Sequence, residues 1–320
     1  LTPAAICTGT VFNYAPTTAT SGTSITWTRP AISGISNAAI TTPQTSNPNE
    51  TLVNTTASPV DVVYVYSLTA NGCTNTQNVT VSVNPTPTLS SSLTPTAVCS
   101  NSGFTYTPTS LTAGASFAWT RSVVAGISNG AGSGSGNINE VLINSTSNPI
   151  DVIYAYTITA NGCNSTQNVT VRVNPTPNIT PSPIDITICS GKTFNFTPQN
   201  GVNGRVPAGT TYTWTRVDNT NISGDSNQPT PQSSISQTLT TTSNLTTIHT
   251  VNYTVTPRTG TCAVGPSFQV RVTVNPTPTV NAVSNQSVCE GANTAVITFG
   301  GNTIAGKTYT WTNSNPSIGL

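Results

Sequence analysis

The stretch Val83-Asn84-Pro85-Thr86-Pro87 decides how this chain is divided, because it recurs at residues 173–177 and again at 274–278. Each copy follows a run of alternating valines and precedes a segment that carries a cysteine. Recurrence at a similar spacing is typical of tandem repeats. Proline fixes φ, and each residue before a proline favours extended backbone. We therefore expect Asn-Pro-Thr-Pro to form a short, stiff connector between repeats.

The spacing of this connector predicts three complete repeats and part of a fourth. We place repeats 1, 2 and 3 at residues 1–83, 89–173 and 179–274, an incomplete repeat 4 at 280–320, and proline linkers at 84–88, 174–178 and 275–279. The chain opens at Leu1 without an initiator methionine, which suggests a processed chain or an excerpt.

The composition excludes several classes of function. Charged residues make up 5% of the 320 residues and the net charge is +1, so nothing favours binding to nucleic acid or to an anionic membrane. No stretch approaches the roughly 18 to 20 apolar residues that span a bilayer, so we expect no membrane insertion in this part of the protein. Apolar residues still make up 35%, and they alternate with Thr, Ser and Asn. This pattern predicts half-buried β-strands.

A tryptophan occupies the middle of one alternating strand in every repeat. The repeat 3 copy reads Tyr212-Thr213-Trp214-Thr215-Arg216, and apolar residues there share one face of the strand. We predict that these tryptophans anchor the cores of β-sandwiches: Trp27, Trp119, Trp214 and Trp311. A ligand-stacking platform is the functional alternative for such a residue.

The strand pair that ends each repeat carries the strongest local signal. Residues 61–70 form a long run rich in Val and Tyr that leads into Asn71-Gly72, and residues 151–162 repeat this pattern. Asn-Gly accepts positive φ at both positions and predicts a tight β-hairpin. Residues 132–136, Gly-Ser-Gly-Ser-Gly, predict a flexible loop, since the lysine and helix of a phosphate-binding loop are missing.

Seven cysteines fall two to a repeat, with one left over. We predict one disulfide inside each repeat, each of which ties the first strand to the last hairpin: Cys7–Cys73, Cys99–Cys163 and Cys189–Cys262. Cys289 is expected to pair beyond Leu320. Disulfides of this number indicate an oxidising, extracellular compartment, and each closes a loop of roughly 65 residues, worth about 4 kcal/mol.

These units resemble the PKD-like and Ig-like repeats of very long surface proteins in Bacteroidota. The residues that carry the resemblance are Tyr212-Thr213-Trp214, Tyr309-Thr310-Trp311, the Asn-Gly-Cys hairpins and the closing Val-x-Val-Asn-Pro-Thr-Pro. A PKD domain proper usually continues after its tryptophan with Asp-Phe-Gly-Asp-Gly, which is absent here. The resemblance implies seven-stranded sandwiches, surface display and adhesion. It extends to gliding-motility adhesins of the SprB kind, which the type IX system exports.

Catalytic constellations are poorly supported, and we expect neither an enzyme nor a cofactor. His249 is the only histidine and lies on a predicted strand, where it needs no chemical role. Glu50 and Asp61 are spaced like Glu140 and Asp151, which would suit a Ca²⁺ site or an acid pair. Repeat 3 breaks this pattern because Gln237 stands in place of the glutamate, so we expect no metal.

An arginine follows the tryptophan in the first three repeats, as Arg29, Arg121 and Arg216. Since arginine and tryptophan share a face near the strand end, we expect the arginine to cover an aromatic ring. A site that reads the carboxylate of a ligand is the functional alternative.

The sequence therefore predicts an all-β, linear tandem array of Ig-like or PKD-like β-sandwiches with one disulfide per domain. Its expected function is that of a structural stalk in an extracellular adhesin or surface filament. Two alternatives stay open: the repeats themselves bind glycans or surface proteins, or they form the spacer of a secreted multidomain enzyme. The uncharged, Thr-rich faces also leave sheet edges unprotected, which allows lateral self-association into fibres.

Overall fold

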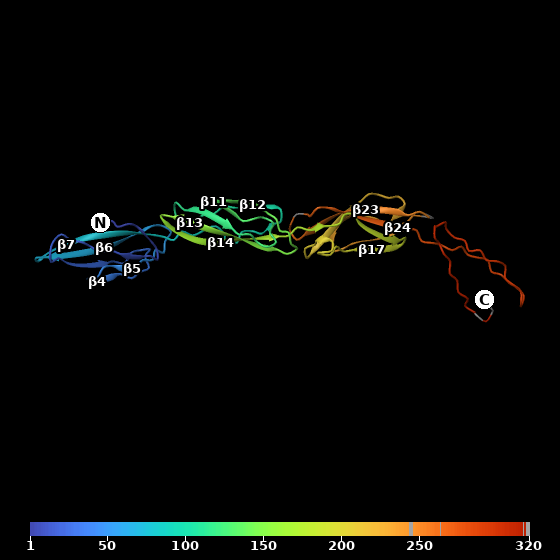
Figure 1. The fold of residues 1–320 in the computed structure, drawn as a ribbon, viewed down its shortest axis with the longest axis horizontal. Coiled ribbons are helices and arrows are strands. Elements are labelled where there is room, and N and C mark those ends of the chain that lie inside the picture. Colours follow the sequence, from blue (N-terminus) through green and yellow to red (C-terminus); the bar gives the residue numbers. More distant parts are fainter. Residues whose placement is uncertain (243–245, 263, 316, 318–320) are drawn as a thin grey trace. The chain divides into compact units, whose positions relative to one another are not determined.

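The computed structural model describes residues 1–242, 246–262, 264–315 and 317, and every named element in these residues is a β-strand. The chain divides into two compact units. The first consists of Leu1–Ser145 with Pro149–Asn174, and the second of Thr146–Asn148 with Pro175–Leu320. Repeats 1 and 2 belong to the first unit and repeat 3 to the second (Figure 1). The predicted all-β fold class is confirmed.

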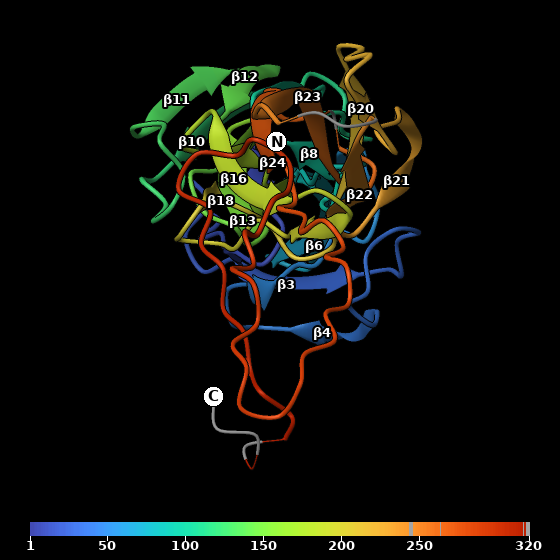
Figure 2. The same cartoon turned by 90° about the vertical axis from the view of Figure 1, so that its right-hand side faces the viewer.

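Repeat 1 is a sandwich of two sheets. Five strands form one sheet in the order β1-β7-β6-β3-β4, and β2 pairs with β5 in the other. Figure 2 shows β4 beside β3 at the edge of the larger sheet. The strands are β1 (Ile6–Cys7), β2 (Val11–Asn13), β3 (Ser24–Arg29), β4 (Ile40–Gln44), β5 (Asn49–Thr51), β6 (Val60–Ala70) and β7 (Cys73–Asn84).

Repeat 2 follows the same plan with seven strands, the number that the resemblance implied. Its larger sheet has the order β11-β10-β13-β14-β8, and β12 pairs with β9. The strands are β8 (Val98–Cys99), β9 (Ser102–Tyr106), β10 (Ser116–Arg121), β11 (Gly132–Ser135), β12 (Ile138–Leu142), β13 (Ile150–Ala160) and β14 (Cys163–Asn174).

Repeat 3 keeps the five-stranded sheet and enlarges the rest. Its sheets have the orders β16-β24-β23-β19-β21, β17-β22-β20 and β15-β18. The strands are β15 (Asn178–Ile179), β16 (Ile184–Cys189), β17 (Lys192–Phe196), β18 (Gly204–Arg205), β19 (Thr210–Arg216), β20 (Ile222–Ser223), β21 (Gln228–Gln232), β22 (Ile235–Thr241), β23 (His249–Thr259) and β24 (Phe268–Asn275).

The tight hairpins form where Asn-Gly predicts them. In repeat 1, Ala70 pairs with Cys73 across the turn, and Asn71 and Gly72 have φ of 50° and 77°. The turn of repeat 2 is equivalent, with φ of 52° at Asn161 and 77° at Gly162. Positive φ at both central residues twists the turn in the same sense as the long strands that it joins.

The cores are built from the inward-facing aromatic residues of both sheets. Trp27, Trp119 and Trp214 are 5%, 7% and 5% exposed and lie in the three core clusters. In repeat 1, the ring of Trp27 meets Tyr64 edge-on at 5.3 Å, and Phe12 from the smaller sheet lies 5.0 Å from the same tyrosine. Each tryptophan therefore lies at the centre of a sandwich, where an aromatic side chain contributes most by burial.

Trp311 differs from the other tryptophans, and its assignment as a core anchor is wrong. It is 64% exposed, and no strand is assigned among the described residues after Asn275. In each of the three repeats the tryptophan strand pairs with the long strand that precedes the hairpin, namely β6, β13 or β23. No such strand lies among the described residues from 280 to 317.

The cysteine pairing predicted from sequence is also wrong. Cys7 of repeat 1 is bonded to Cys163 of repeat 2, with Cα atoms 5.7 Å apart. Cys99 and Cys262 are likewise disulfide-bonded, whereas Cys73, Cys189 and Cys289 are free, exposed thiols. The pairs Cys7–Cys73, Cys99–Cys163 and Cys189–Cys262 therefore do not form. The partner expected for Cys289 beyond Leu320 stays a prediction.

Strand direction explains the error. β1 pairs in parallel with the end of β7, so that Cys7 lies opposite Asn84, whereas Cys73 begins β7. β7 has 12 residues, so at about 3.3 Å per residue the two cysteines lie roughly 35 Å apart. No disulfide spans more than about 7 Å between Cα atoms. The first cysteine and the hairpin cysteine thus lie at opposite ends of a repeat.

Candidate functional site

Each of the first two repeats buries a charge cluster, which we define by its arginine, glutamate and tyrosine. In repeat 1, Arg29 ends β3, Glu50 lies on β5 of the opposite sheet, and Tyr64 lies on β6. Arg29 donates from Nε and Nη2 to the two oxygens of Glu50 at 2.9 Å each. The Tyr64 hydroxyl donates to Glu50 Oε2 at 2.7 Å. The cluster joins the two sheets, and Arg29 is fully buried.

Repeat 2 reproduces this geometry. Arg121 donates from Nε and Nη2 to Glu140 at 3.0 Å each, and the Tyr154 hydroxyl donates to the same carboxylate at 2.5 Å. The Arg121 guanidinium also lies 5.9 Å from the centre of the Tyr154 ring. The expected arginine–aromatic contact is thus present, but on the tyrosine of the long strand. From the sequence, the ring of the tryptophan on the same strand was the expected partner of the arginine.

The electrostatics of the cluster follow from its burial. Burial tends to raise the pKa of Glu140, but the hydrogen bonds from Arg121 and Tyr154 outweigh this effect and hold the pKa below its usual value. Burial and the hydrogen bond to the neighbouring glutamate raise the pKa of Tyr64 and Tyr154 far above the ordinary tyrosine value. In repeat 2, Glu140 therefore stays charged and Tyr154 neutral, as a buried ion pair requires.

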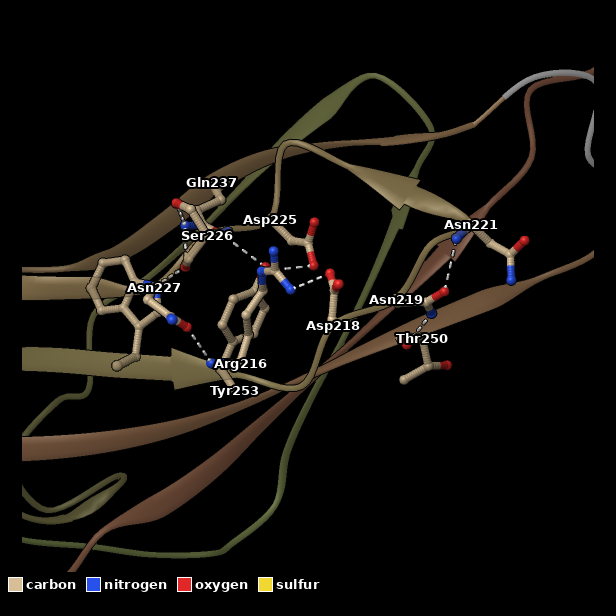
Figure 3. Close-up of polar contacts among 11 residues, drawn as sticks. Arg216, Asp218, Asn219, Asn221, Asp225, Ser226, Asn227, Gln237, Thr250 and Tyr253 are labelled. Carbon is tan, nitrogen blue, oxygen red and sulfur yellow. Dashed lines mark hydrogen bonds and ion pairs between the residues drawn. The ribbon is translucent and has the colours of Figure 1, made fainter.

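In repeat 3, the equivalent arginine and tyrosine, Arg216 and Tyr253, have different hydrogen-bond and ion-pair partners (Figure 3). Gln237 stands opposite Phe194, where Glu140 stands opposite Phe104, and accepts the Tyr253 hydroxyl at 2.7 Å. Arg216 instead meets Asp218, which lies between β19 and β20, and Asp225, which lies between β20 and β21. Its Nη1 donates to Asp218 at 2.5 Å, and its Nε lies 3.0 Å from Asp225 at an angle too poor for a hydrogen bond.

The arginines are therefore structural, and the carboxylate that each one reads belongs to the protein itself. The alternative of a site for a ligand carboxylate is wrong, because the ion-pairing edge of each arginine is already occupied. The acid pair is not assembled either: Glu50 points into its cluster while Asp61 is exposed on β6 of the other sheet. Within the described residues, no three His, Cys, Asp or Glu side chains gather as metal ligands.

His249 begins β23 and lies opposite Val274 of β24. Its Nε2 lies 3.0 Å from the hydroxyl of Thr247, two residues earlier in the chain. Among the described residues, no third group is recorded on the other ring nitrogen of His249 to orient the imidazole as a catalytic triad requires.

The glycine-rich stretch of repeat 2 is a strand and not the flexible loop predicted from its composition. β11 pairs in regular register with β10, and Gly134 lies opposite Trp119. A Cβ atom at Gly134 would come within 2.8 Å of the Trp119 ring, and one at Gly132 within 3.1 Å of Arg121 Nη2 and Glu140 Oε1. Glycine is needed because the strand backbone covers the tryptophan and the charge cluster directly.

The junction is the second candidate site, and we define it as residues 84–89 together with the β13–β14 hairpin. The disulfide from Cys7 reaches Cys163 at the start of β14. Asn84 Nδ2 donates to the backbone oxygen of Asn161 at 2.8 Å in the hairpin turn. The contacts of the cysteine and the asparagine fix the end of β7 against the hairpin of the next repeat.

The linker itself is also held. The hydroxyl of Ser165 donates to the backbone oxygen of Pro87, and Leu89 N donates to Gln167 Oε1 at 2.6 Å. The Leu89 side chain is 9% exposed and belongs to the core cluster of repeat 2. Sequence reasoning predicted a stiff linker from its prolines but missed that the linker packs on the following hairpin. The shared Asn-Gly-Cys-x-x-x-Gln pattern of the hairpins was the signal.

The described residues contain no helix that is long and apolar enough to cross a membrane.

Comparison with known proteins identifies the class. The PKD-like domain family matches this chain three times, at residues 4–87, 96–177 and 186–278. Together these matches cover most of the chain, which therefore belongs to the PKD-like domain family. A search of curated proteins found no match.

Solved structures that match this chain include tandem immunoglobulin and cadherin domains. A three-domain titin fragment, I67–I69, is 11% identical with a TM-score of 0.42, and the match covers 86% of this chain and 96% of the fragment. Sidekick-1 immunoglobulin domains 1–5 are 12% identical with a TM-score of 0.25, covering 80% of this chain and 52% of theirs. Protocadherin gamma B2 cadherin domains 1–5 are 11% identical with a TM-score of 0.28, covering 82% and 55%.

Proposed function

We propose that this chain is a non-enzymatic structural stalk segment of a long extracellular adhesin or surface filament, which holds a distal binding region away from the cell. The observation that carries the proposal is the junction, where a disulfide, a linker and three hydrogen bonds fix repeat 2 on repeat 1. Repeats that are bonded to one another, rather than closed on themselves, suit an element that transmits tension. The disulfides also favour an oxidising compartment outside the cytoplasm.

The inter-repeat bond changes how a pulling force travels. The two cysteines are 156 residues apart in sequence, so the chain between them lies inside a covalent loop. Force that enters at Cys7 passes through the bond, and the sandwich strands within the loop carry little of it. An intra-repeat disulfide would protect one domain but leave the linker to bear the whole load.

Force–extension measurements on the full chain test this role. After complete reduction, unfolding should release at least about 500 Å of additional length, because the 156-residue loop closed by Cys7 and Cys163 becomes extensible at roughly 3.3–3.6 Å per residue and the bonding of Cys99 and Cys262 is lost as well. Equal length release with and without reductant would contradict the stalk proposal.

A binding assay separates the stalk from a binding module. The proposal predicts that the isolated chain binds no member of a glycan panel and captures no surface protein. Specific binding that disappears when the loops are replaced would favour the alternative. By its resemblance, we also propose display on a Bacteroidota cell surface through type IX secretion, and protease shaving of intact source cells would test that location.

A further inference from the structure

Each repeat has an edge strand beside its tryptophan strand, and the edge strand of repeat 2 differs from the other two. β4, β11 and β21 end the larger sheets of repeats 1, 2 and 3. β4 contains Pro43, and β21 contains Pro229 and Pro231. The register of both strands also shifts along the tryptophan strand. Since proline removes a backbone donor and an irregular register disturbs the ladder, these two edges are protected against pairing with a further strand.

β11 has neither form of protection. It reads Gly-Ser-Gly-Ser over residues 132–135, contains no proline and pairs with β10 in regular register. No charged residue lies between Arg121 and Glu140, so the charges that protect many natural sheet edges are missing as well. The three residues 133–135 are exposed. The outer edge of the repeat 2 sheet is therefore open to pairing.

The hydrogen-bond pattern shows which groups of β11 point outward. Gly136 N donates to Phe117 O at 2.9 Å, which makes these two residues a hydrogen-bonded pair. In an antiparallel ladder such pairs alternate with pairs that do not bond to each other. Gly134 therefore bonds toward β10, whereas the backbone N–H and C=O groups of Ser133 and Ser135 point away from it. These outward groups are the donors and acceptors that a further strand would use.

The tryptophan beneath β11 lacks a partner at the same edge. In repeats 1 and 3 the indole N–H donates to a backbone oxygen close to the end of the edge strand, that of Ser46 at 2.6 Å and that of Ser226 at 3.1 Å. Trp119 is 7% exposed, and its Nε1 has no hydrogen-bond partner among the described residues. A Cβ atom at Gly134 would lie 3.0 Å from this nitrogen. Because buried donors normally find an acceptor, the unpaired N–H indicates that a polar group is missing at this edge.

The sequence of the edge fits a second copy of itself. Residues 132–136 read Gly-Ser-Gly-Ser-Gly, which is the same in both directions. When two such strands pair antiparallel about Gly134, Ser133 of each copy lies opposite Ser135 of the other, and every glycine lies opposite a glycine. The opposed serines then exchange backbone hydrogen bonds. This self-complementarity is what a twofold contact between identical chains requires.

We propose that the outer edge of β11 is the docking site for a second copy of this chain, which pairs through its own β11 in antiparallel orientation. The two five-stranded sheets of repeat 2 then form one continuous sheet. Because the contact occupies the open edge of both copies, it joins chains in pairs and not in open-ended fibres. The site goes beyond the proposed stalk role, since it assigns a partner to repeat 2 whether or not the array displays a binding region.

Self-association of the full chain tests the proposal. Cys73→Ser, Cys189→Ser and Cys289→Ser remove the exposed free thiols, so that disulfide exchange between chains does not contribute. Sedimentation equilibrium should then show a reversible equilibrium between monomer and dimer as the concentration rises.

Hydrogen exchange locates the contact within the dimer. The amides of Ser133 and Ser135 should gain protection as the concentration rises, because their N–H groups are bonded only when a second strand is present. The amide of Gly134 should change little, because it already bonds to β10. Mass spectrometry with residue-level fragmentation measures all three.

Two substitutions at Ser133 separate backbone pairing from other association. Ser133 precedes the residue opposite Trp119, as Pro43 precedes the residue opposite Trp27 in repeat 1. Ser133→Pro thus introduces the protection that repeat 1 carries, and it should weaken dimerisation about 30-fold, since the symmetric contact loses two backbone hydrogen bonds. The matched control Ser133→Ala keeps the N–H and should change dimerisation by less than about threefold. Circular dichroism checks that both variants are folded.

The proposal is overturned if the folded chain stays monomeric, if the two Ser133 variants dimerise equally, or if the dimer leaves the amides of Ser133 and Ser135 unprotected. It is also overturned if an unrelated extended peptide protects these amides as strongly as a second copy does, because the edge would then accept any strand. If Ser133→Pro does not fold, hydrogen exchange of the parent chain decides the question.

Discussion

Repeats 1 and 2 are nearly the same domain, yet their hairpin ends lie in opposite environments. Both have seven strands, an edge-on tryptophan–tyrosine contact and a buried Arg–Glu–Tyr cluster. Cys163 of repeat 2 is buried and bonded to the preceding repeat, whereas Cys73 at the equivalent position of repeat 1 is exposed and free. The comparison teaches that the fold of a repeat is set locally, while the state of its hairpin cysteine is set by the neighbouring repeat.

The largest predicted effect compares the two hairpin cysteines. Cys163→Ser removes a cross-link that spans 156 residues, and the loop-entropy treatment gives a loss of about 5 kcal/mol in the free energy of unfolding. Cys73→Ser should leave the free energy of unfolding nearly unchanged, because that thiol is exposed and unbonded. Denaturant unfolding without reductant measures both variants. Equal losses of unfolding free energy for the two variants would contradict the claim that only Cys163 is cross-linked.

The second prediction concerns what the two repeats share. Glu140→Ala leaves Arg121, which is 3% exposed, without its carboxylate, and should lower the free energy of unfolding by about 3–5 kcal/mol. Glu50→Ala should cost a similar amount in repeat 1. The matched control is Asp151→Ala, an exposed carboxylate of repeat 2, which should change stability by less than about 0.5 kcal/mol. Thermal unfolding followed by circular dichroism measures all three variants. Equal unfolding curves for Glu140→Ala, Glu50→Ala and Asp151→Ala would mean that the charge clusters do not stabilise the repeats.

The third prediction addresses a difference between the two edge strands. In repeat 1 the register of β4 shifts between Trp27 and Arg29, whereas β11 of repeat 2 covers Trp119 in regular register with glycine. Gly134→Ala would place a methyl group 2.8 Å from the Trp119 ring and should cost about 1–3 kcal/mol. Gly130→Ala meets nothing within 4 Å and serves as the control. Equal unfolding midpoints for the two variants would mean that the glycines of β11 are not required by packing.

The smallest predicted effect is a loss of stability that occurs only at alkaline pH. Burial, and secondarily the nearby Tyr14, raise the pKa of Tyr66 to about 12 from the ordinary value of 10.0. The unfolded chain therefore loses its phenol proton first, so stability should fall as the pH rises from about 10 to about 12 and should be unaffected at neutral pH. Because other buried tyrosines, among them Tyr64 and Tyr154, also have raised pKa values, Tyr66→Phe should make this limb shallower without removing it. Chemical denaturation at several alkaline pH values measures it, and an unchanged slope in the variant would rule out this tyrosine as the cause.

Much of the fold could be predicted because it depends on local signals. The Val- and Tyr-rich run of residues 61–70, the Asn-Gly turns and the recurring tryptophans each specify short-range structure. The structure contains the strands and hairpins that they predict. The glycine stretch of repeat 2 misled because its composition is that of a flexible loop. The need for glycine there comes from Trp119, which lies across the sheet and is distant in sequence.

The junction could not be predicted from spacing because two cysteines in one repeat look like natural partners. The pairing depends on the direction of β1 relative to β7. Because β1 runs parallel to the end of β7, Cys7 lies beside Asn84 and far from Cys73. Sequence patterns define which residues form strands but not which end of a sheet each strand reaches. The partner of Arg29 was missed for a related reason, since Glu50 lies on the opposite sheet.

The most direct test of the inter-repeat junction is to digest the unreduced protein and map its disulfide-linked peptides by mass spectrometry. The account predicts a peptide pair that joins Cys7 to Cys163, with Cys73 recovered as a thiol. Recovery of Cys7 bonded to Cys73, or of Cys99 bonded to Cys163, would contradict it and would mean that each repeat is closed on itself.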